Sequence, residues 1–279
     1  MKNYIETYRG DVSPWEVDST EHFTVAYYYE KFEAATWRFL KHSGVNPNAC
    51  RTTEALTHYK AELRNRDIYR IESACIQNND QSRIAHKLFN AESGELCTTM
   101  QQNITGVSLD IPAEKWDGDI KEERAIPTSK AKWLPTSKDV TRTEETDWSG
   151  NLSLPGFIHR YSTANSFILA AFGLTSEYLT KSRIGLSTFE FQLKFEKTVS
   201  PGTMIDIESC IAHLGGSSIR LFHKMIDSET KEEISSLSQF GVHLDLDLRR
   251  PSKIPDELRE RAKACLLYTS PSPRDATLS

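Results

Sequence analysis

The sequence lacks the features that mark secreted, membrane-spanning and metal-binding proteins. Its five cysteines show no paired spacing, so we expect free thiols that pack as small apolar residues in a reducing compartment, the cytoplasm. No CxxC or HxxxH pattern supports a metal site. No apolar run approaches the roughly 18–20 residues that span a bilayer. The first residues, MKNYIETYRGDV, lack the apolar core of a signal peptide, and we expect none.

The chain also lacks an excess of positive charge. Its 34 Lys and Arg against 39 Asp and Glu give a net charge of −5, so we expect no general attraction to nucleic acid or to an anionic membrane. A length of 279 residues, 38% of them hydrophobic and 26% charged, is typical of one large or two small soluble domains.

What the sequence does contain is a long internal repeat. RIAHKLFNAESGE, which begins at Arg83, recurs as RLFHKMIDSETKEE from Arg220, and Asp18 matches Asp147 further upstream. The shift changes only from 129 to 137 positions between these matches, which indicates a few loop insertions. A period of this length is too long for a solenoid, so it indicates a duplicated domain.

Each copy opens with one strong helical pattern. Apolar residues at the i, i+3, i+4, i+7 spacing predict helices over residues 24–41 and 153–170, and Thr24 and Ser153 suit the N-cap positions. Strand-length runs separated by turn signals follow each helix, and a short strand precedes it. Each copy is therefore predicted to be an α+β unit, in which a curved antiparallel sheet wraps around the central helix.

This pattern divides the chain into four parts. We expect one domain over residues 1–112, a charged linker over 113–138, and a second domain over 139–264. The last stretch, CLLYTSPSPRDATLS at 265–279, resembles translated adapter sequence from a sequencing library. We therefore expect this tail to be non-native and the natural chain to continue differently after Ala264.

The stretch before each predicted helix carries a motif. In the first copy, PWEVDSTEHFTVAYYYEKFEAATW supplies Trp15, Asp18, His22, Tyr28, Phe32, Glu33 and Ala35. In the second copy, TDWSGNLSLPGFIHRYSTAN keeps Asp147 and Gly150. The motif resembles that of the hotdog thioesterases, in their 4-hydroxybenzoyl-CoA thioesterase-like branch. The sequence departs from the pattern at Glu21, where Gly is expected, at Thr24 and Ser153, where Asn is expected, and at Asn151, where His is expected.

The resemblance implies a fold, a substrate and an assembly. It implies two tandem hotdog domains that form a pseudo-dimer within one chain, with active sites between the two partners. It also implies hydrolysis of a small-molecule acyl-CoA, with coenzyme A as part of the substrate and no metal or organic cofactor. The two hotdog copies pair within one chain, and two such chains could in turn form a homodimer.

The chemistry of thioester hydrolysis selects the candidate residues. A carboxylate can act as base or nucleophile, and the first N–H groups of a helix can stabilise the oxyanion. The catalytic candidates are Asp18, His22, Asp147, Glu54 and Glu190. The substrate-binding candidates are Thr24, Val25, Tyr28, Ser153 and Leu154.

These candidates differ in weight. Asp18 is expected to matter more than Asp147, because only the first copy keeps a His in its motif. Glu54 and Glu190 are duplicated acids at the start of predicted strands, where a solvent-facing position is the alternative to a catalytic one. For the matched pair His86 and His223, we expect a structural role and not a catalytic one.

Two other function classes remain open from sequence. A hotdog dehydratase or hydratase would use a His and an acid to take a proton from carbon. A non-catalytic acyl-thioester-binding module would explain the motif losses at Glu21, Thr24, Asn151 and Ser153.

Overall fold

The structure, a computed structural model, describes residues 4–18, 21–78, 81–109, 111–128 and 131–266. Most of the predicted non-native tail, residues 267–279, lies outside the described residues. The chain forms two compact units. Unit 1 takes the residues up to Lys121 together with Arg142–His159 and Lys194–Pro201. Unit 2 takes Glu122–Thr141, Arg160–Leu193 and the residues from Gly202 onward.

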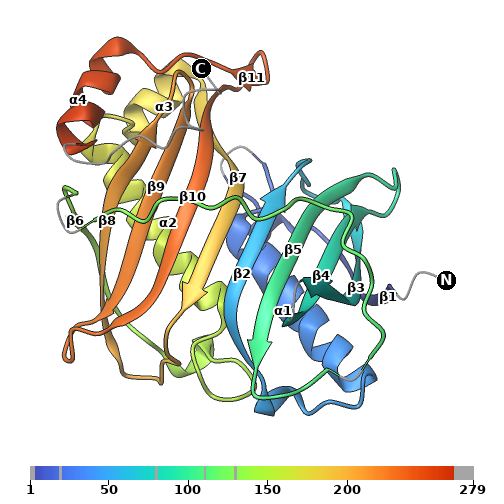
Figure 1. The fold of residues 1–279 in the computed structure, drawn as a ribbon. Helices are drawn as coiled ribbons and strands as arrows, with labels where there is room; N and C mark the ends of the chain where they lie inside the picture. The colour runs from blue at the N-terminus through green and yellow to red at the C-terminus, as the bar shows by residue number, and fades with distance from the viewer. Residues whose placement is uncertain (1–3, 19–20, 79–80, 110, 129–130, 267–279) are drawn as a thin grey trace. The chain divides into compact units, whose positions relative to one another are not determined.

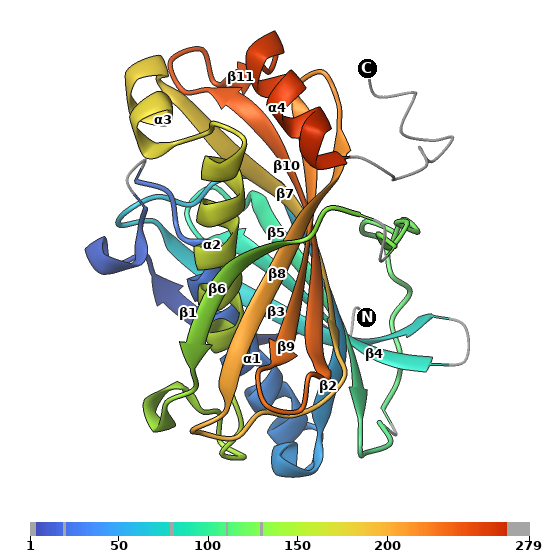
Figure 2. The same ribbon diagram turned by 90° about the vertical axis from the view of Figure 1, so that its left-hand side faces the viewer.

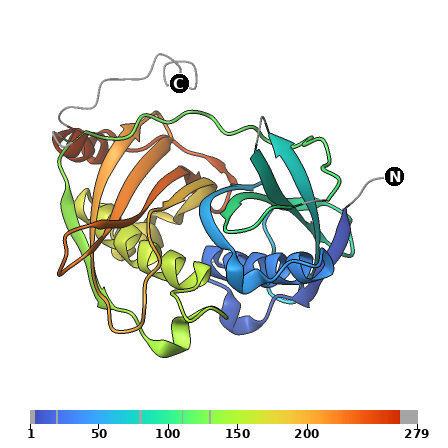
Figure 3. The ribbon, with the colours of Figure 1, turned by 60° about the horizontal axis from the view of Figure 1, so that its bottom comes forward.

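Unit 1 is an antiparallel sheet with helix α1 on one face. Its elements in chain order are β1 (Ile5–Asp11), α1 (Val25–His42), β2 (Arg51–Tyr59), β3 (Ile68–Asn78), β4 (Gln81–Asn90) and β5 (Leu96–Thr105). The strands lie in the order β1-β3-β4-β5-β2. The helix packs against β1, β3 and β4, and Figure 3 shows it in blue against the inner face of its sheet. Tyr29, Phe32 and Phe39 are buried on that side of α1, as the apolar stripe predicts.

Unit 2 repeats this plan with two additional helices. The elements of this second copy are β6 (Leu134–Val140), α2 (Leu154–Ala171), α3 (Ser176–Ser182), β7 (Ile184–Phe195), β8 (Met204–Leu214), β9 (Ser218–Asp227), β10 (Glu233–Asp245), β11 (Arg250–Pro251) and α4 (Asp256–Leu266). The first residues of α2, up to His159, and the last two of β7, Lys194 and Phe195, belong to unit 1. The strands follow the order β7-β10-β9-β8-β6, with β11 paired to β10. Figure 2 shows β6 beside β8, the place that β1 takes beside β3 in unit 1.

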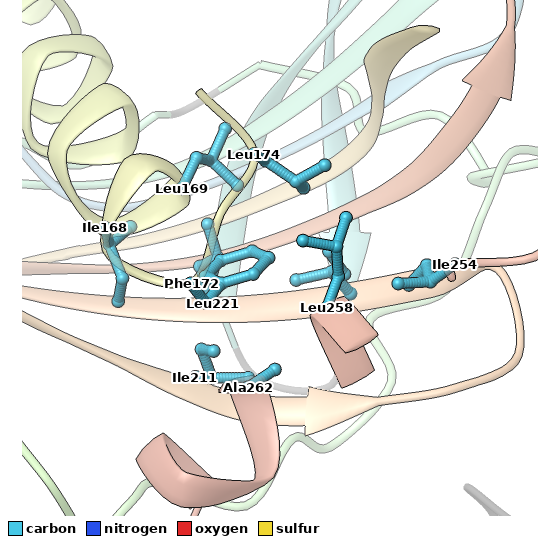
Figure 4. Close-up of a cluster of buried hydrophobic side chains, with 10 residues drawn as sticks. Ile168, Leu169, Phe172, Leu174, Ile211, Leu221, Ile254, Leu258 and Ala262 are labelled. Carbon is cyan, nitrogen blue, oxygen red and sulfur yellow. The ribbon is translucent and has the colours of Figure 1, made fainter. Parts of the chain in front are cut away.

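The core of unit 2 joins three kinds of element. Phe172, at the end of α2, is fully buried, and it packs with Leu221 of β9 and with Leu258 and Ala262 of α4 (Figure 4). The α4 helix lies against β8. Because α4 supplies two of these buried side chains, it is part of the hydrophobic core of this unit.

The structure confirms the α+β prediction and both central helices. The helices α1 and α2 begin and end one residue later than predicted. Two details differ: β6 begins at Leu134 inside the stretch expected to be linker, and α3 and α4 were not predicted. In unit 1, β5 ends at Thr105. The strand ends there because Gly106 has a φ of +91°, which turns the chain away from the sheet.

A buried hydrogen-bonded triplet is built once in each unit. In unit 1, the hydroxyl of Ser73 lies 2.6 Å from Thr7 Oγ1 and 2.6 Å from His86 Nδ1. In unit 2, Thr136, Ser209 and His223 repeat both contacts at 2.6 Å. Burial lowers the pKa of each histidine to about 3, so both imidazoles are neutral.

The triplet explains why the passages that begin at Arg83 and Arg220 match. Each passage forms the second strand of a hairpin, and its histidine lies opposite the serine of the preceding strand. The structural role expected for the two histidines therefore agrees with the geometry.

Candidate functional site

The same two backbone hydrogen bonds close both motif loops. In the first loop, the N–H of Asp18 donates to the carbonyl of His22 (2.9 Å), and the N–H of Glu21 donates back to the carbonyl of Asp18 (3.0 Å). In the second loop, Asp147, Gly150 and Asn151 make the same two bonds, at 2.7 and 3.1 Å. The duplication therefore extends to the backbone that carries each candidate aspartate.

The aspartate side chains hold these loops together. Asp18 Oδ1 accepts the N–H of His22 at 3.2 Å, and Asp147 Oδ1 accepts the N–H of Asn151 at 3.1 Å. Asp147 Oδ1 also accepts the N–H and the hydroxyl of Ser149, at 2.8 and 2.6 Å. Each carboxylate therefore has a structural bond in its loop and lies just before a helix, as the sequence predicts.

His22 is held by Glu62 in the first motif. Its Nε2 lies 2.9 Å from Glu62 Oε2, and this contact raises the pKa of the imidazole. A carboxylate on one imidazole nitrogen orients the ring and stabilises its charged form. Glu62 therefore fixes the orientation of His22 in this motif.

The predicted N-cap residues behave differently from each other. The hydroxyl of Thr24 donates to the carbonyl of Glu16 at 2.7 Å and makes no capping bond to α1, so the predicted capping role is wrong for this residue. Ser153 Oγ accepts the N–H of Gly156 at 3.3 Å and so caps α2.

The start of α2 already holds an anionic oxygen. The N–H of Leu154, the first residue of α2, donates to Glu33 Oε1 at 2.8 Å. Both residues belong to unit 1. The helix dipole and the unpaired N–H groups of a first turn favour negative charge at this position.

A cavity of about 290 Å³ opens at this contact, and every residue that lines it belongs to unit 1. The walls combine two carboxylates, apolar and aromatic side chains, polar side chains and two cations. Those that matter below are Glu33, Asp147, Trp37, Trp148, Phe157, Phe195, Thr36, Gln102, Arg51 and Lys197. An apolar pocket with a few convergent polar groups is the usual form of a small-molecule site.

The aromatic wall joins the loop to the first helix. The rings of Trp37 and Trp148 lie 4.4 Å apart between centroids and are tilted by 36°, so the residue after Asp147 packs against α1. The same helix carries Glu33, one turn before Trp37. The ring contact therefore joins the loop that carries Asp147 to the helix that carries Glu33, and both carboxylates line the same cavity.

The polar wall connects the cavity to the buried triplet of unit 1. Thr36 Oγ1 lies 3.0 Å from His86 Nε2, and Gln102 Nε2 bonds both Thr36 and His86. Thr52 donates to the amide oxygen of Gln102 at 3.1 Å. With all these bonds made, Gln102 is fixed in one orientation on the cavity wall.

Glu33 is the residue that the choice of site candidates missed. Its pKa is raised to about 7, chiefly by burial and to a smaller extent by Asp147 and Glu30, while the bond from Leu154 acts in the opposite direction. The sequence held one signal, an acid placed next to the buried stripe residue Phe32. Its partner lies 121 positions away, and no periodicity within one helix could have indicated that contact.

Glu54 and Glu190 lie outside this cavity lining. Glu54 Oε2 accepts from Asn103 (3.0 Å) and pairs with Lys121 (3.3 Å). In unit 2, Glu190 is buried and pairs with Arg124 at 3.2 Å. Both acids therefore anchor residues 111–128, called the connecting segment below.

The connecting segment lies on the sheet face opposite the helices. Figure 1 shows it in green in front of the strands, with α1 and α2 behind them. In unit 1 it is also held by Lys87–Asp117 (2.5 Å) and Lys60–Asp119 (2.6 Å). The duplicated acids Glu54 and Glu190 thus belong to a docking surface for the chain itself.

Tyr28 packs in the interior of unit 1. It is buried, its ring lies against Phe23 and Tyr59, and burial raises the pKa of its hydroxyl. Val25 begins α1 at the position that Leu154 takes in α2. Neither Tyr28 nor Val25 lines the cavity described above.

Two further searches cover the described residues only. In the part of the chain that the structure describes, no group of three or more His, Cys, Asp or Glu side chains is placed to hold a metal ion. None of the described helices is both long and apolar enough to cross a membrane.

Comparison with known proteins places the chain in a family. The sequence model of the thioesterase-like superfamily matches residues 12–128 and again 141–262. No curated protein sequence matches the chain.

Three solved structures share the fold at low identity. A Lactobacillus plantarum protein assigned as an oleoyl thioesterase is 11% identical, with a TM-score of 0.67 over 87% of this chain and 98% of that one. An acyl-ACP thioesterase from Bacteroides thetaiotaomicron is 11% identical, with a TM-score of 0.62 over 85% and 96%. The 12:0-ACP thioesterase from Umbellularia californica is 10% identical, with a TM-score of 0.62 over 86% and 94%. The chain therefore belongs to the thioesterase-like superfamily and carries its hotdog fold twice in tandem.

Proposed function

We propose that the chain hydrolyses acyl thioesters in the cavity beside the second motif. Asp147 is the base or nucleophile, and the Leu154 N–H is the oxyanion donor. The observation that carries this proposal is the 2.8 Å bond from Leu154 to a carboxylate oxygen inside a cavity that Asp147 also lines. An N–H that already holds one anionic oxygen has the direction and dipole that a tetrahedral oxyanion needs.

The cavity also suits an acyl group. Trp37, Trp148, Phe157 and Phe195 supply apolar walls next to the two carboxylates. The acyl chain would bury apolar surface there, at roughly 25 cal/mol for each Å² removed from water. We propose an acyl-CoA as the substrate, with coenzyme A entering only as its thiol part and with no other cofactor.

This proposal reverses the order expected between the two aspartates. From sequence, the retained His22 favoured Asp18. The contacts favour Asp147 instead, because His22 is engaged with Glu62, and because Asp147 shares a cavity with a helix N-terminus.

The test is thiol release from a panel of acyl-CoAs by the unmodified chain and by two matched variants. Asp147→Asn keeps the size and most hydrogen bonds of the side chain but removes the base, so kcat should fall by a factor on the order of 10² or more. Asp18→Asn makes the same change in the matching loop and should cost less than about tenfold.

Each other outcome has a definite meaning. Greater damage from Asp18→Asn would return the active site to the first motif. If neither variant slows turnover, the carboxylate mechanism is wrong. Tight acyl-CoA binding by the unmodified chain, without thiol release, would identify a binding module, and conversion of an enoyl-CoA would identify a hydratase.

A further inference from the structure

Glu33 has no part in the mechanism proposed above, although it lines the cavity and accepts the N–H that would hold the oxyanion. We propose that Glu33 is the general acid of this site. Its carboxylate is displaced from the Leu154 N–H by the substrate carbonyl oxygen, takes up a proton, and delivers that proton to the sulfur that leaves. This inference rests on the proposed hydrolysis and adds a second catalytic residue to it.

The geometry places Glu33 at the reacting group. Its Oε1 lies 2.8 Å from the Leu154 nitrogen, which is the position that the substrate oxygen must take to receive that N–H. The displaced carboxyl stays attached to α1 in the same cavity. It therefore remains within about one side-chain rotation of the carbonyl carbon and its sulfur, the reach that general acid catalysis requires.

Substrate binding itself would protonate Glu33. Burial, Asp147 and Glu30 all raise the pKa of this carboxyl, which stands at about 7, and the bond from Leu154 lowers it. Once a substrate oxygen takes the N–H, the lowering effect is lost and the pKa rises further. Arg51 and Lys197 line the same cavity, so its walls carry charges of both signs.

The acid is present in one copy only. Asp18 and Asp147 match at a shift of 129 positions, and the same shift sets Glu33 against Ser162. A partly buried carboxyl costs free energy unless it is compensated, and nothing in the repeated fold requires one at this point of the helix. A function at the second motif accounts for its presence in α1 and its absence from α2.

The steps balance without another reagent. Asp147 takes a proton from water as the water oxygen bonds to the carbonyl carbon, and the π electron pair moves to the oxygen held by Leu154. The intermediate collapses, the C–S bond breaks with its electron pair on sulfur, and Glu33 gives its proton to that sulfur. The proton on Asp147 then returns to Glu33, and Glu33 releases to solvent the proton taken up on binding as its carboxylate returns to the Leu154 N–H. The free acid, the free thiol and the starting enzyme remain.

Two thioesters with the same acyl group test this role. One is an acyl-CoA, whose alkyl thiolate needs a proton to leave. The other is the matching nitrothiophenyl ester, whose thiolate leaves without one. Glu33→Gln keeps an oxygen for the Leu154 N–H but cannot donate the proton. It should lower kcat about 10²-fold on the acyl-CoA and change it less than about threefold on the aryl thioester.

The pH profile supplies a second readout. The acyl-CoA rate of the unmodified chain should fall as pH rises through the pKa of Glu33 in the substrate complex, and Glu33→Gln should not show this fall. Glu92→Gln makes the same change at an exposed acid in the turn between β4 and β5, outside the cavity lining, and is the control that should retain the activity on both esters. Its melting temperature and that of Glu33→Gln show whether both variants are folded.

The remaining outcomes overturn the inference. Equal losses on both esters would make Glu33 a base or a positioning residue. An unchanged or faster rate on both would make it a plug that occupies the N–H. If the unmodified chain hydrolyses neither ester, the proposed function fails, and this result differs from every outcome that concerns Glu33 alone.

Discussion

Glu21 and Gly150 take the same place in the two motif loops, with φ values of +65° and +80°. Only glycine adopts this left-handed region without a steric cost, and other residues lose roughly 1 kcal/mol or more there. Glu21 therefore adopts the same left-handed backbone conformation as Gly150, and this conformation is strained for a residue with a side chain.

Two substitutions at these positions should shift stability in opposite directions. Glu21→Gly should raise the free energy of unfolding by about 0.5–1 kcal/mol, because the strain at this residue is removed. Gly150→Ala should lower it by about 1 kcal/mol, since a Cβ there meets no atom within 4 Å and only the backbone cost applies. Urea unfolding at pH 7 measures both values, and changes of the same sign would contradict the argument.

Sequence reasoning found half of the candidate site at this scale. Asp147 and Leu154 followed from the motif and from the position of a helix start, which are local signals. Glu33 was noticed only as part of a resemblance, because its role depends on a contact with a residue in the other copy. Glu54 and Glu190 were noticed because they are duplicated, and their partners Lys121 and Arg124 lie in a segment with no periodic pattern.

At the scale of elements, the connecting segment is the part whose anchoring differs most along its length. In unit 2, Arg124 pairs with a carboxylate that is only 6% exposed, while in unit 1 Lys121 and Glu54 are each 34% exposed. Buried and exposed pairs of this kind have very different energetic effects when one partner is removed.

Arg124→Met and Lys121→Met should therefore differ in stability. The first leaves Glu190 buried without its cation and should lower the free energy of unfolding by about 2–4 kcal/mol. The second should cost less than about 1 kcal/mol, because water solvates Glu54. Thermal and urea unfolding of the pair decide the matter, and equal effects would mean that Glu190 finds other partners.

The elements themselves were predictable where the pattern is long. The stripes of α1 and α2 fixed both helices to within one residue, since each runs for five turns of 3.6-residue spacing. The helix α4 escaped prediction because it is short and charged, with only a narrow apolar side. Its two buried residues, Leu258 and Ala262, are buried by contacts with distant residues in the core of unit 2, which the local sequence does not indicate.

At the scale of the whole molecule, the two ends of the last helix should respond differently to truncation. Deletion of Cys265–Ser279 should leave the melting temperature and any activity unchanged, as expected of a non-native tail. Deletion from Asp256 onward removes Leu258 and Ala262 from the core of unit 2 and should cost at least about 3 kcal/mol. Calorimetry of both truncations is the measurement, and a large loss from the first would show that the tail belongs to the protein.

The duplication was the strongest whole-molecule prediction, because ordered matches along the chain need no structural knowledge. Which of the two matching loops would share a cavity with an acid was not predictable. That outcome depends on the side chains that other elements bring to the cavity, such as Trp37 from α1 and Phe195 from β7.

The ion pairs that hold the connecting segment should differ in their sensitivity to ionic strength. The pairs Lys60–Asp119 and Lys121–Glu54 are open to water, and mobile ions at 0.15 M screen exposed charges over about 8 Å. The Arg124–Glu190 pair is largely shielded from such ions. Added salt should therefore detach the N-terminal part of the connecting segment from the sheet first. A protease that cleaves only detached backbone should then cut before Lys121, while the residues around Arg124 stay protected.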